Sequence, residues 1–205
     1  MKRSIVIIIL LAATAVSSPA QIFRVGVRAG ANISDYSFSD FTFNGVAISH
    51  GKPKAGFETA LVARLTIITM LHVQAEFEYS RTGYGFTYVG DGEPGRSIKV
   101  HANRMEIPLE LGVNIGPVRL FTGVAFRVAH NEKSNAPSLL KVEFNGSNTG
   151  IMGGVGLNIR RLFIDARITG CPRSSGKNTF IIDGDRRRVS VGRNLRWSLS
   201  AGVMF

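Results

Sequence analysis

The sequence predicts an all-β chain that folds as an eight-stranded antiparallel up-and-down β-barrel and crosses a membrane. Three observations lead to this fold class. Apolar and polar residues alternate with period two in many stretches, the connections between these stretches alternate between short and long, and no apolar segment is long enough for a membrane-spanning helix. Because lipid offers the backbone no hydrogen-bond partner, a membrane-embedded chain without such a helix must close its strands into a barrel.

The alternation is clearest between residues 104 and 115. One face of this segment carries bulky apolar residues from Met105 to Ile115, and the other carries polar or small residues from Arg104 to Asn114. Residues of a strand point alternately to its two faces, so this pattern predicts a strand with one oily face. The same pattern predicts seven further strands, at 24–33, 55–67, 71–82, 118–129, 150–159, 162–170 and 195–205.

The connections between these strands fall into two length classes. Three are tight turns, at Ile68-Thr69-Met70, Gly116-Pro117 and Arg160-Arg161. Four are long, at 34–54, 83–103, 130–149 and 171–194, and they are rich in Gly, Ser, Asn and Asp. Short turns at one rim and long loops at the other are typical of bacterial outer-membrane barrels, in which the short turns face the periplasm and the long loops face outwards.

The first residues predict a secretory signal peptide. A basic start at Lys2 and Arg3 precedes the apolar run 5–13, and Ser18 and Ala20 supply small residues before a cleavage site. We therefore expect a signal peptide at 1–20 and one barrel domain at 21–205. The only cysteine, Cys171, has no partner for an internal disulfide, and we interpret it as an inert thiol.

The chain is strongly basic, with a formal net charge of +11. An exported chain has little access to nucleic acid, so we exclude nucleic acid as a partner. Anionic lipid headgroups and lipopolysaccharide phosphates are the expected partners of this charge. The run Arg186-Arg187-Arg188 lies in the last long loop, where we expect solvated charge, with a lipopolysaccharide or surface-polymer contact as the alternative.

Period-two alternation alone does not distinguish a membrane barrel from a soluble, lipocalin-like barrel, because exchanging inside and outside leaves the period unchanged. Side-chain size favours the membrane barrel. The polar face carries many glycines, among them Gly26, Gly112 and Gly154, whereas the aliphatic face is bulky. An eight-stranded barrel has an interior just wide enough for side chains, so the face rich in glycine is expected to point inwards.

The polar face also carries charges of both signs in nearly equal number. Buried charges are tolerated when they are paired and hydrogen-bonded, so we expect a closed lumen filled by ion pairs and not an open channel. This lumenal charge network consists of Arg28, Glu58, Arg64, Glu76, Glu78, Arg104, Glu106, Glu110, Arg119, Arg127, Asp165, Arg167 and Arg196.

Four outward aromatic residues lie at a similar height when each strand is counted from its own periplasmic end. They are Phe57, Tyr79, Phe126 and Trp197, at eight to ten residues from those ends. A strand crosses the bilayer in about 9 to 11 residues, so we expect these four to form an outer aromatic girdle at the headgroup level. The enrichment of aromatic residues in all strands explains their presence but not their shared height.

The last strand ends on an aromatic residue. Apolar residues stand at every second position from Trp197 to Phe205, and this ending resembles the assembly signal that the barrel-insertion machinery reads. The segments Arg104–Leu111, Gly153–Gly156 and Leu162–Arg167 are similar to the PorT-like outer-membrane barrel family. The resemblance implies the fold and the location. Some members of that family take part in protein secretion across the outer membrane, and many have no assigned role.

The sequence offers little catalytic chemistry. A hydrolase or acyltransferase needs a nucleophile beside a base, and no serine is marked as a partner of His50, His72, His101 or His130. His72 is expected to belong to the lumen. His101 and His130 are expected near the outer rim, where two histidines without a carboxylate at a fixed offset are a weak metal motif. We therefore expect no catalytic residue, no metal and no cofactor.

These observations predict a non-enzymatic integral outer-membrane barrel whose outer loops provide an interaction surface. A protein partner bound through those loops would make it accessory to secretion or surface assembly. Two alternatives from other classes are open at this point: an enzyme that modifies lipid A, and a soluble secreted or periplasmic ligand-binding barrel.

Overall fold

A computed structural model describes residues 23–38, 40–43, 46–50, 53–68, 70–89, 96–134, 140–143, 149–170, 177–182 and 185–205. The expected signal peptide at 1–20 and Cys171 lie outside the described residues. No helix among the residues described is long and apolar enough to cross a bilayer.

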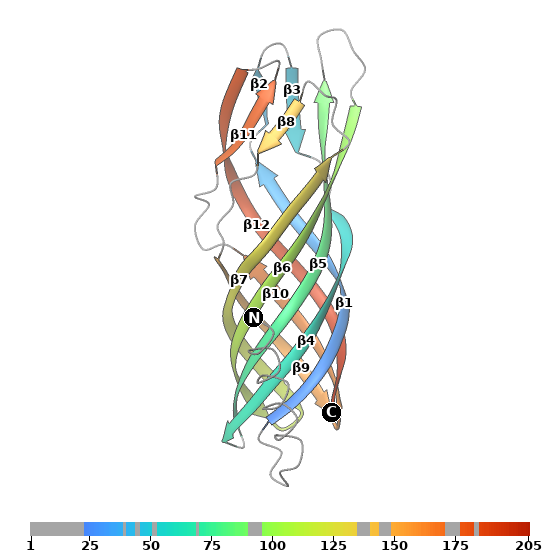
Figure 1. Ribbon diagram of the computed structural model, residues 1–205, viewed down its shortest axis with the longest axis vertical. Coiled ribbons are helices and arrows are strands. Elements are labelled where there is room, and N and C mark those ends of the chain that lie inside the picture. Colours follow the sequence, from blue (N-terminus) through green and yellow to red (C-terminus); the bar gives the residue numbers. More distant parts are fainter. Residues whose placement is uncertain are drawn as a thin grey trace, which may run out of the picture.

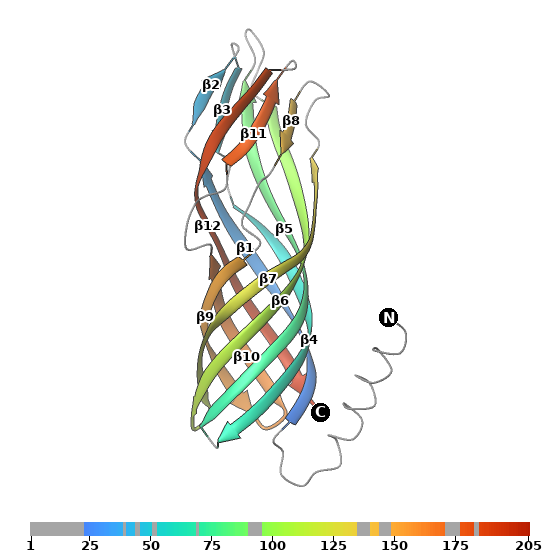
Figure 2. The ribbon, with the colours of Figure 1, turned by 60° about the vertical axis from the view of Figure 1, so that its left-hand side comes forward.

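Eight long strands form a closed antiparallel barrel, as predicted (Figures 1 and 2). Each strand pairs with the next along this series, and the last pairs with the first. The chain connects neighbours in order, which is the up-and-down arrangement. The eight barrel strands are β1 (Phe23–Phe38), β4 (Lys54–Ile68), β5 (Leu71–Val89), β6 (Arg96–Ile115), β7 (Val118–Ser134), β9 (Thr149–Ile159), β10 (Leu162–Gly170) and β12 (Asp185–Met204).

The barrel is closed by the pairing of β1 with β12. Their register runs from Gly26 opposite Met204 to Ser34 opposite Arg196 without a shift. One further hydrogen bond extends the seam, because the backbone N–H of Phe205 donates to the carbonyl oxygen of Val25 at 2.8 Å. Both termini of the barrel therefore lie at the end that carries the short turns, which is the periplasmic end in outer-membrane barrels (Figure 1).

The alternation of the sequence matches the two faces of the barrel wall. Outward side chains are large and apolar and remain exposed, as Leu61, Leu111 and Leu199 illustrate with exposed fractions of 62%, 55% and 62%. Their inward neighbours are buried and mostly polar or charged. A protein with this distribution has its apolar surface on the outside, and only a hydrocarbon surrounding removes that surface from water.

The positions predicted for the outer ends of the strands were wrong, because the strands extend further outwards than predicted. The segment 83–103, expected to be a loop, is largely strand, because β5 and β6 stay paired as far as Tyr88 opposite Arg96. The run Arg186-Arg187-Arg188 likewise lies in β12 and pairs with residues 179–181, whereas a loop was expected. Beyond the membrane both faces of a strand meet water, so backbone pairing continues while the period-two pattern disappears.

Four short strands occupy the other expected loops at this outer end, where Figure 2 shows them above the barrel. One pair forms a hairpin that also pairs with β5, and the other two continue the sheet beyond β12. These strands are β2 (Phe41–Phe43), β3 (Val46–His50), β8 (Leu140–Glu143) and β11 (Lys177–Ile182).

Glycines on the inner face make room for a crowded lumen. A Cβ atom on Gly154 would lie 2.5 Å from the ring of Phe121, and one on Gly156 would lie 2.2 Å from a carboxylate oxygen of Asp165. Strand β9 therefore contributes space where its neighbours contribute large side chains. At Gly123 on β7 the obstacle is backbone, since a Cβ atom would lie 2.0 Å from the carbonyl oxygen of Leu109.

We predict that Gly123→Ala lowers the folded fraction of the barrel. The new methyl group would collide with the backbone of β6, which cannot move away because it is hydrogen-bonded to the strands on both sides. The matched control is Gly153→Ala, whose new methyl group would meet only the carbonyl oxygen of Phe121 at 3.6 Å, an ordinary contact. The measurement is the proportion of protein that runs as the compact, unheated species on SDS gels after refolding. Equal folded fractions for the two variants would contradict the crowding that we describe.

Candidate functional site

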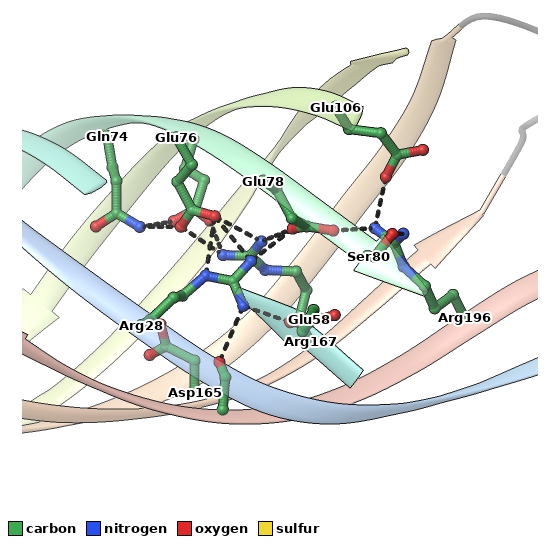
Figure 3. Close-up of polar contacts among 12 residues, drawn as sticks. Arg28, Glu58, Gln74, Glu76, Glu78, Ser80, Glu106, Asp165, Arg167 and Arg196 are labelled. Carbon is green, nitrogen blue, oxygen red and sulfur yellow. Dashed lines mark hydrogen bonds and ion pairs between the residues drawn. The ribbon is translucent and has the colours of Figure 1, made fainter. Parts of the chain in front are cut away.

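The centre of the lumen holds a cluster of buried ion pairs around Arg28 on β1 (Figure 3). Its guanidinium donates to Glu76 at 2.8 and 3.0 Å and to Glu78 at 2.6 Å. It also donates to Glu58 on β4 and, at 3.2 Å, to the hydroxyl of Ser200 on β12. Arg28 thus connects its own strand, β1, to three others, β4, β5 and β12.

Arg167 on β10, which lies across the lumen from β5, reaches the same carboxylates (Figure 3). It donates to the two oxygens of Glu76 at 2.8 and 3.1 Å, and it pairs with Glu110 on β6. A longer ion pair of 3.4 Å joins it to Glu78. Because Glu76 and Glu78 are each shared between Arg28 and Arg167, the cluster spans the lumen from wall to wall.

Towards the outer end, Arg196 on β12 continues the cluster. Its guanidinium lies 2.9 Å from Glu78 and 2.7 Å from Glu106, and it donates to the hydroxyl of Ser80 at 3.0 Å. Arg127 on β7 lies 3.6 Å from Glu106 and is only half-buried. Arg104 is buried in this same region.

Towards the periplasmic end, Arg119 on β7 forms a further buried ion pair. It donates to both carboxylate oxygens of Asp165 on β10 at 2.5 Å. Arg64 on β4 contacts amide oxygens, that of Gln74 at 2.6 Å and that of Asn158 at 3.2 Å. The guanidiniums of Arg64 and Arg119 both lie over the ring of Phe163, at 5.1 and 5.4 Å from its centre, which favours their charge within the lumen.

The lumenal charge network therefore lies inside the barrel. All of its members are buried except Arg127, and the contacts above join arginines and carboxylates from β1, β4, β5, β6, β7, β10 and β12. Seven arginines face six carboxylates. Such a balance allows the charges to stay ionised in a lumen that lipid surrounds, because each carboxylate is neutralised and hydrogen-bonded locally.

Above the network lies an uncharged polar layer that the sequence analysis missed. Asn32, Ser34 and Thr82 are buried, and their side chains include polar atoms without a hydrogen-bond partner among the described residues. Buried polar groups of this kind are normally satisfied by water. The layer was missed because its residues lie at or beyond the predicted outer strand ends, although they keep the inward parity of their strands.

The four aromatic residues expected in the girdle point away from the lumen. Phe57 and Tyr79 contact each other, with ring centres 6.1 Å apart. Phe57, Phe126 and Trp197 are 47%, 42% and 58% exposed, respectively. Directly beyond Tyr79 on the outward face of β5 comes the exposed Arg81, so the apolar band ends at this height.

The three histidines whose side chains are described, His72, His101 and His130, lie in different surroundings. His72 is fully buried in the lumen. His101 and His130 are exposed on β6 and β7, but the register places His130 opposite Arg104 and His101 opposite Lys133, so the two histidines are not cross-strand partners. The side chain of His50 lies outside the description. Within the described part of the chain, no three His, Cys, Asp or Glu side chains are placed to hold a metal ion.

A family model described as "Outer membrane protein beta-barrel domain" matches residues 18–169. The chain belongs to this family of outer-membrane barrels. The match covers most of the barrel, and the outward apolar band agrees with it, so the protein lies in the outer membrane and the soluble alternative is set aside. The resemblance to the PorT-like family is a narrower hypothesis, which the match does not address.

Solved outer-membrane barrels share the fold. The structure is similar to the outer membrane protein OprG from Pseudomonas aeruginosa, with a TM-score of 0.59, 10% identity, and coverage of 89% of this chain and 95% of OprG. It is also similar to the outer membrane protein AlkL in lipid bilayers, with a TM-score of 0.53, 13% identity, and coverage of 92% and 94%. At such low identity these likenesses show the fold alone. No curated protein sequence matches the chain significantly.

We predict that Arg28→Ala lowers the free energy of unfolding by about 3–5 kcal/mol, because the change leaves Glu58, Glu76 and Glu78 buried with fewer counter-charges. Urea unfolding in bilayers, followed by the fluorescence of Trp197, the only tryptophan, measures this quantity. Arg81→Ala is the matched control, since Arg81 is exposed. A loss below about 1 kcal/mol for Arg28→Ala would show that the cluster is not a stabilising feature.

Proposed function

We propose that the protein is a non-enzymatic outer-membrane barrel with a closed lumen, which holds an interaction surface outside the membrane. The observation that carries this proposal is the ion-pair cluster of Arg28 and Arg167, because it fills the cross-section of the lumen at mid-height. A closed lumen leaves the outer strands as the part of the protein that is available for function.

Two features of the cluster support closure. Carboxylates from β4, β5 and β6 form direct ion pairs with arginines from β1 and β10. An interior of eight strands is also just wide enough for side chains, whereas diffusion channels are formed by about 16 strands. Opening a path through the cluster would separate buried opposite charges, which is costly in a lumen surrounded by lipid.

The outer strands support the interaction surface. From Trp197 back to its first residue, Asp185, β12 continues for a further 12 residues, about 40 Å along the strand. Crossing the bilayer requires only about 9 to 11 residues per strand, so this length is not needed for insertion. Expected partners of such a surface are lipopolysaccharide, a surface polymer or another protein, the last in an accessory role in secretion or surface assembly.

The non-enzymatic assignment rests on the positions of the candidate bases. His72, the strand histidine, is enclosed in the lumen and has no route to a lipid substrate outside the wall. A lipid-A-modifying enzyme is the alternative, and it predicts activity on lipopolysaccharide that disappears when His72, His101 or His130 is replaced.

We further propose that Phe57, Tyr79, Phe126 and Trp197 form the outer aromatic girdle and that Phe205 is the assembly signal. The outward position of all four aromatic residues supports the first proposal. The second is supported by the position of Phe205, which is 70% exposed at the free end of β12.

We predict that the purified protein gives no steady porin-sized conductance in planar bilayers. Replacing both central arginines, Arg28→Ala with Arg167→Ala, should raise the conductance, because the remaining carboxylates repel one another and admit water and cations. Arg81→Ala serves as the charge-matched control on the outer surface. A large steady conductance of the unmodified protein would contradict closure.

We predict that the fluorescence of Trp197 is quenched most strongly by lipids brominated at shallow acyl positions, because amphipathic rings favour the headgroup level. Trp197 is the only tryptophan, so the signal reports one site. Strongest quenching at the bilayer centre would contradict the girdle, and the absence of quenching at every depth would show that this face does not meet lipid.

A further inference from the structure

Two hollows at the periplasmic end of the barrel have Phe205 in their lining. The first, of about 450 Å³, is an apolar groove on the lipid-facing surface of β1, β4 and β5, and its lining includes Val25, Leu61, Ala63, Ala75 and Phe77. The second, of about 270 Å³, is a basic cleft at the periplasmic rim, lined by Arg24, Arg160, Arg161, Met204 and Phe205. Phe205 is the residue that the two linings share, so the hollows adjoin at its side chain.

The apolar groove exists because small residues interrupt a bulky surface. The register aligns Val25, Ala63 and Ala75 as outward neighbours on three adjacent strands. Ala63 and Ala75 lie between larger outward residues, among them Leu61 and Phe77, which are 62% and 45% exposed. In the membrane, hydrocarbon chains fill this groove, because an empty groove would lose van der Waals contacts with its lining residues.

The basic cleft lies where the turn between β9 and β10 meets the end of β12. The backbone N–H of Met204 donates to the carbonyl oxygen of Arg161 at 2.8 Å, which places the two turn arginines beside Phe205. Near this rim, the described ranges 23–26, 64–68, 70–72, 112–120, 155–166 and 201–205 contain one acidic side chain, Asp165, which Arg119 engages with both oxygens. Three arginines line the cleft, and no carboxylate side chain is among its lining residues.

The backbone of Arg160 supplies a second, independent observation. Its φ angle is +58°, in the left-handed region that glycine adopts without cost. The corresponding turn at the end of β6 uses glycine at this place, with a φ angle of +60° at Gly116. A two-residue hairpin turn requires a positive φ angle at this place, and the turn presents the side chain of Arg160 at the rim, where it lines the cleft.

We propose that the groove and the cleft together form a binding site for one anionic phospholipid of the periplasmic leaflet. The phosphate of the headgroup lies among Arg24, Arg160 and Arg161, and an acyl chain passes Phe205 and lies along Ala63 and Ala75. The order of the two hollows agrees with the membrane, because the charged cleft is at the rim and the apolar groove is on the adjoining lipid-facing wall. Basic residues at such a boundary attract anionic headgroups.

The test titrates phosphatidylglycerol and phosphatidylethanolamine onto the full barrel in detergent and counts bound lipid by native mass spectrometry. We expect one phosphatidylglycerol bound at least tenfold more tightly than phosphatidylethanolamine. The double variant Arg160→Gly with Arg161→Gln should weaken it about 30-fold, from about a fivefold loss per basic residue. Ala63→Leu should weaken it as well, because the added side chain occupies the groove.

The controls separate the site from general surface effects. Arg81→Gln removes a charge at the other end of the barrel, and Ala166→Leu adds the same bulk on the outward face of β10, so neither should change phosphatidylglycerol binding. Arg160→Gly should not lower the urea midpoint of unfolding, because glycine relieves the strained φ angle. If the double variant fails to fold, Arg161→Gln alone carries the test, with an expected loss of about fivefold.

Three results would overturn the proposal. Equal affinity for the two lipids would remove the role of the cleft. Unchanged binding in the arginine variants would do the same. Competition by inorganic phosphate, together with an Ala63→Leu variant that binds phosphatidylglycerol normally, would show that the cleft holds only the anionic headgroup and that no acyl chain occupies the groove.

Discussion

The contacts of Arg28 and Arg167 with four glutamates form the centre on which the rest of this barrel depends. Ionised groups inside a wall surrounded by hydrocarbon have to be neutralised by one another. This requirement accounts for the residues around the cluster. Phe121 and Phe163 offer ring faces to guanidiniums, and β9 presents glycines where further side chains would collide. The outer surface contacts lipid and must therefore be free of charge across the membrane, which accounts for its apolar band.

The sequence predicts the membrane-spanning part of the fold well because each strand there has lipid on one face and the lumen on the other. These two environments make apolar and polar residues alternate with period two. Lipid on one side and a charged lumen on the other produce the alternation from Met105 to Ile115, and the structure has a strand there. The prediction fails beyond Thr82 on β5 and before Leu195 on β12, where the strands continue but both faces meet water. Backbone hydrogen bonds hold those regions together, and backbone bonding leaves no trace in side-chain hydropathy.

The members of the lumenal charge network share the inward parity of their strands near mid-barrel, although inward parity also includes Arg24 and Lys54 at the strand ends, which are not members. The partners were not predictable from parity, because they depend on the stagger of the strands around the barrel. Arg28 meets Glu58, which stands diagonally on the next strand, and Glu76 and Glu78 two strands away. Neutral members such as Gln74 and Ser200 carry no charge pattern, so only the structure reveals their contacts.

The pairing of β1 with β12 affects the order in which the barrel folds. Arg28 lies in the first strand and donates to Ser200 in the last, 172 residues later in the chain. Contacts of such separation form late in folding, because the loop between them must close first. An unfinished chain is therefore an open sheet whose arginines and glutamates face water, and it cannot enter hydrocarbon without burying them unpaired. The last strand therefore completes the seam and the lumenal charge network together, because it supplies both the partner of β1 and the side chains of Arg196 and Ser200.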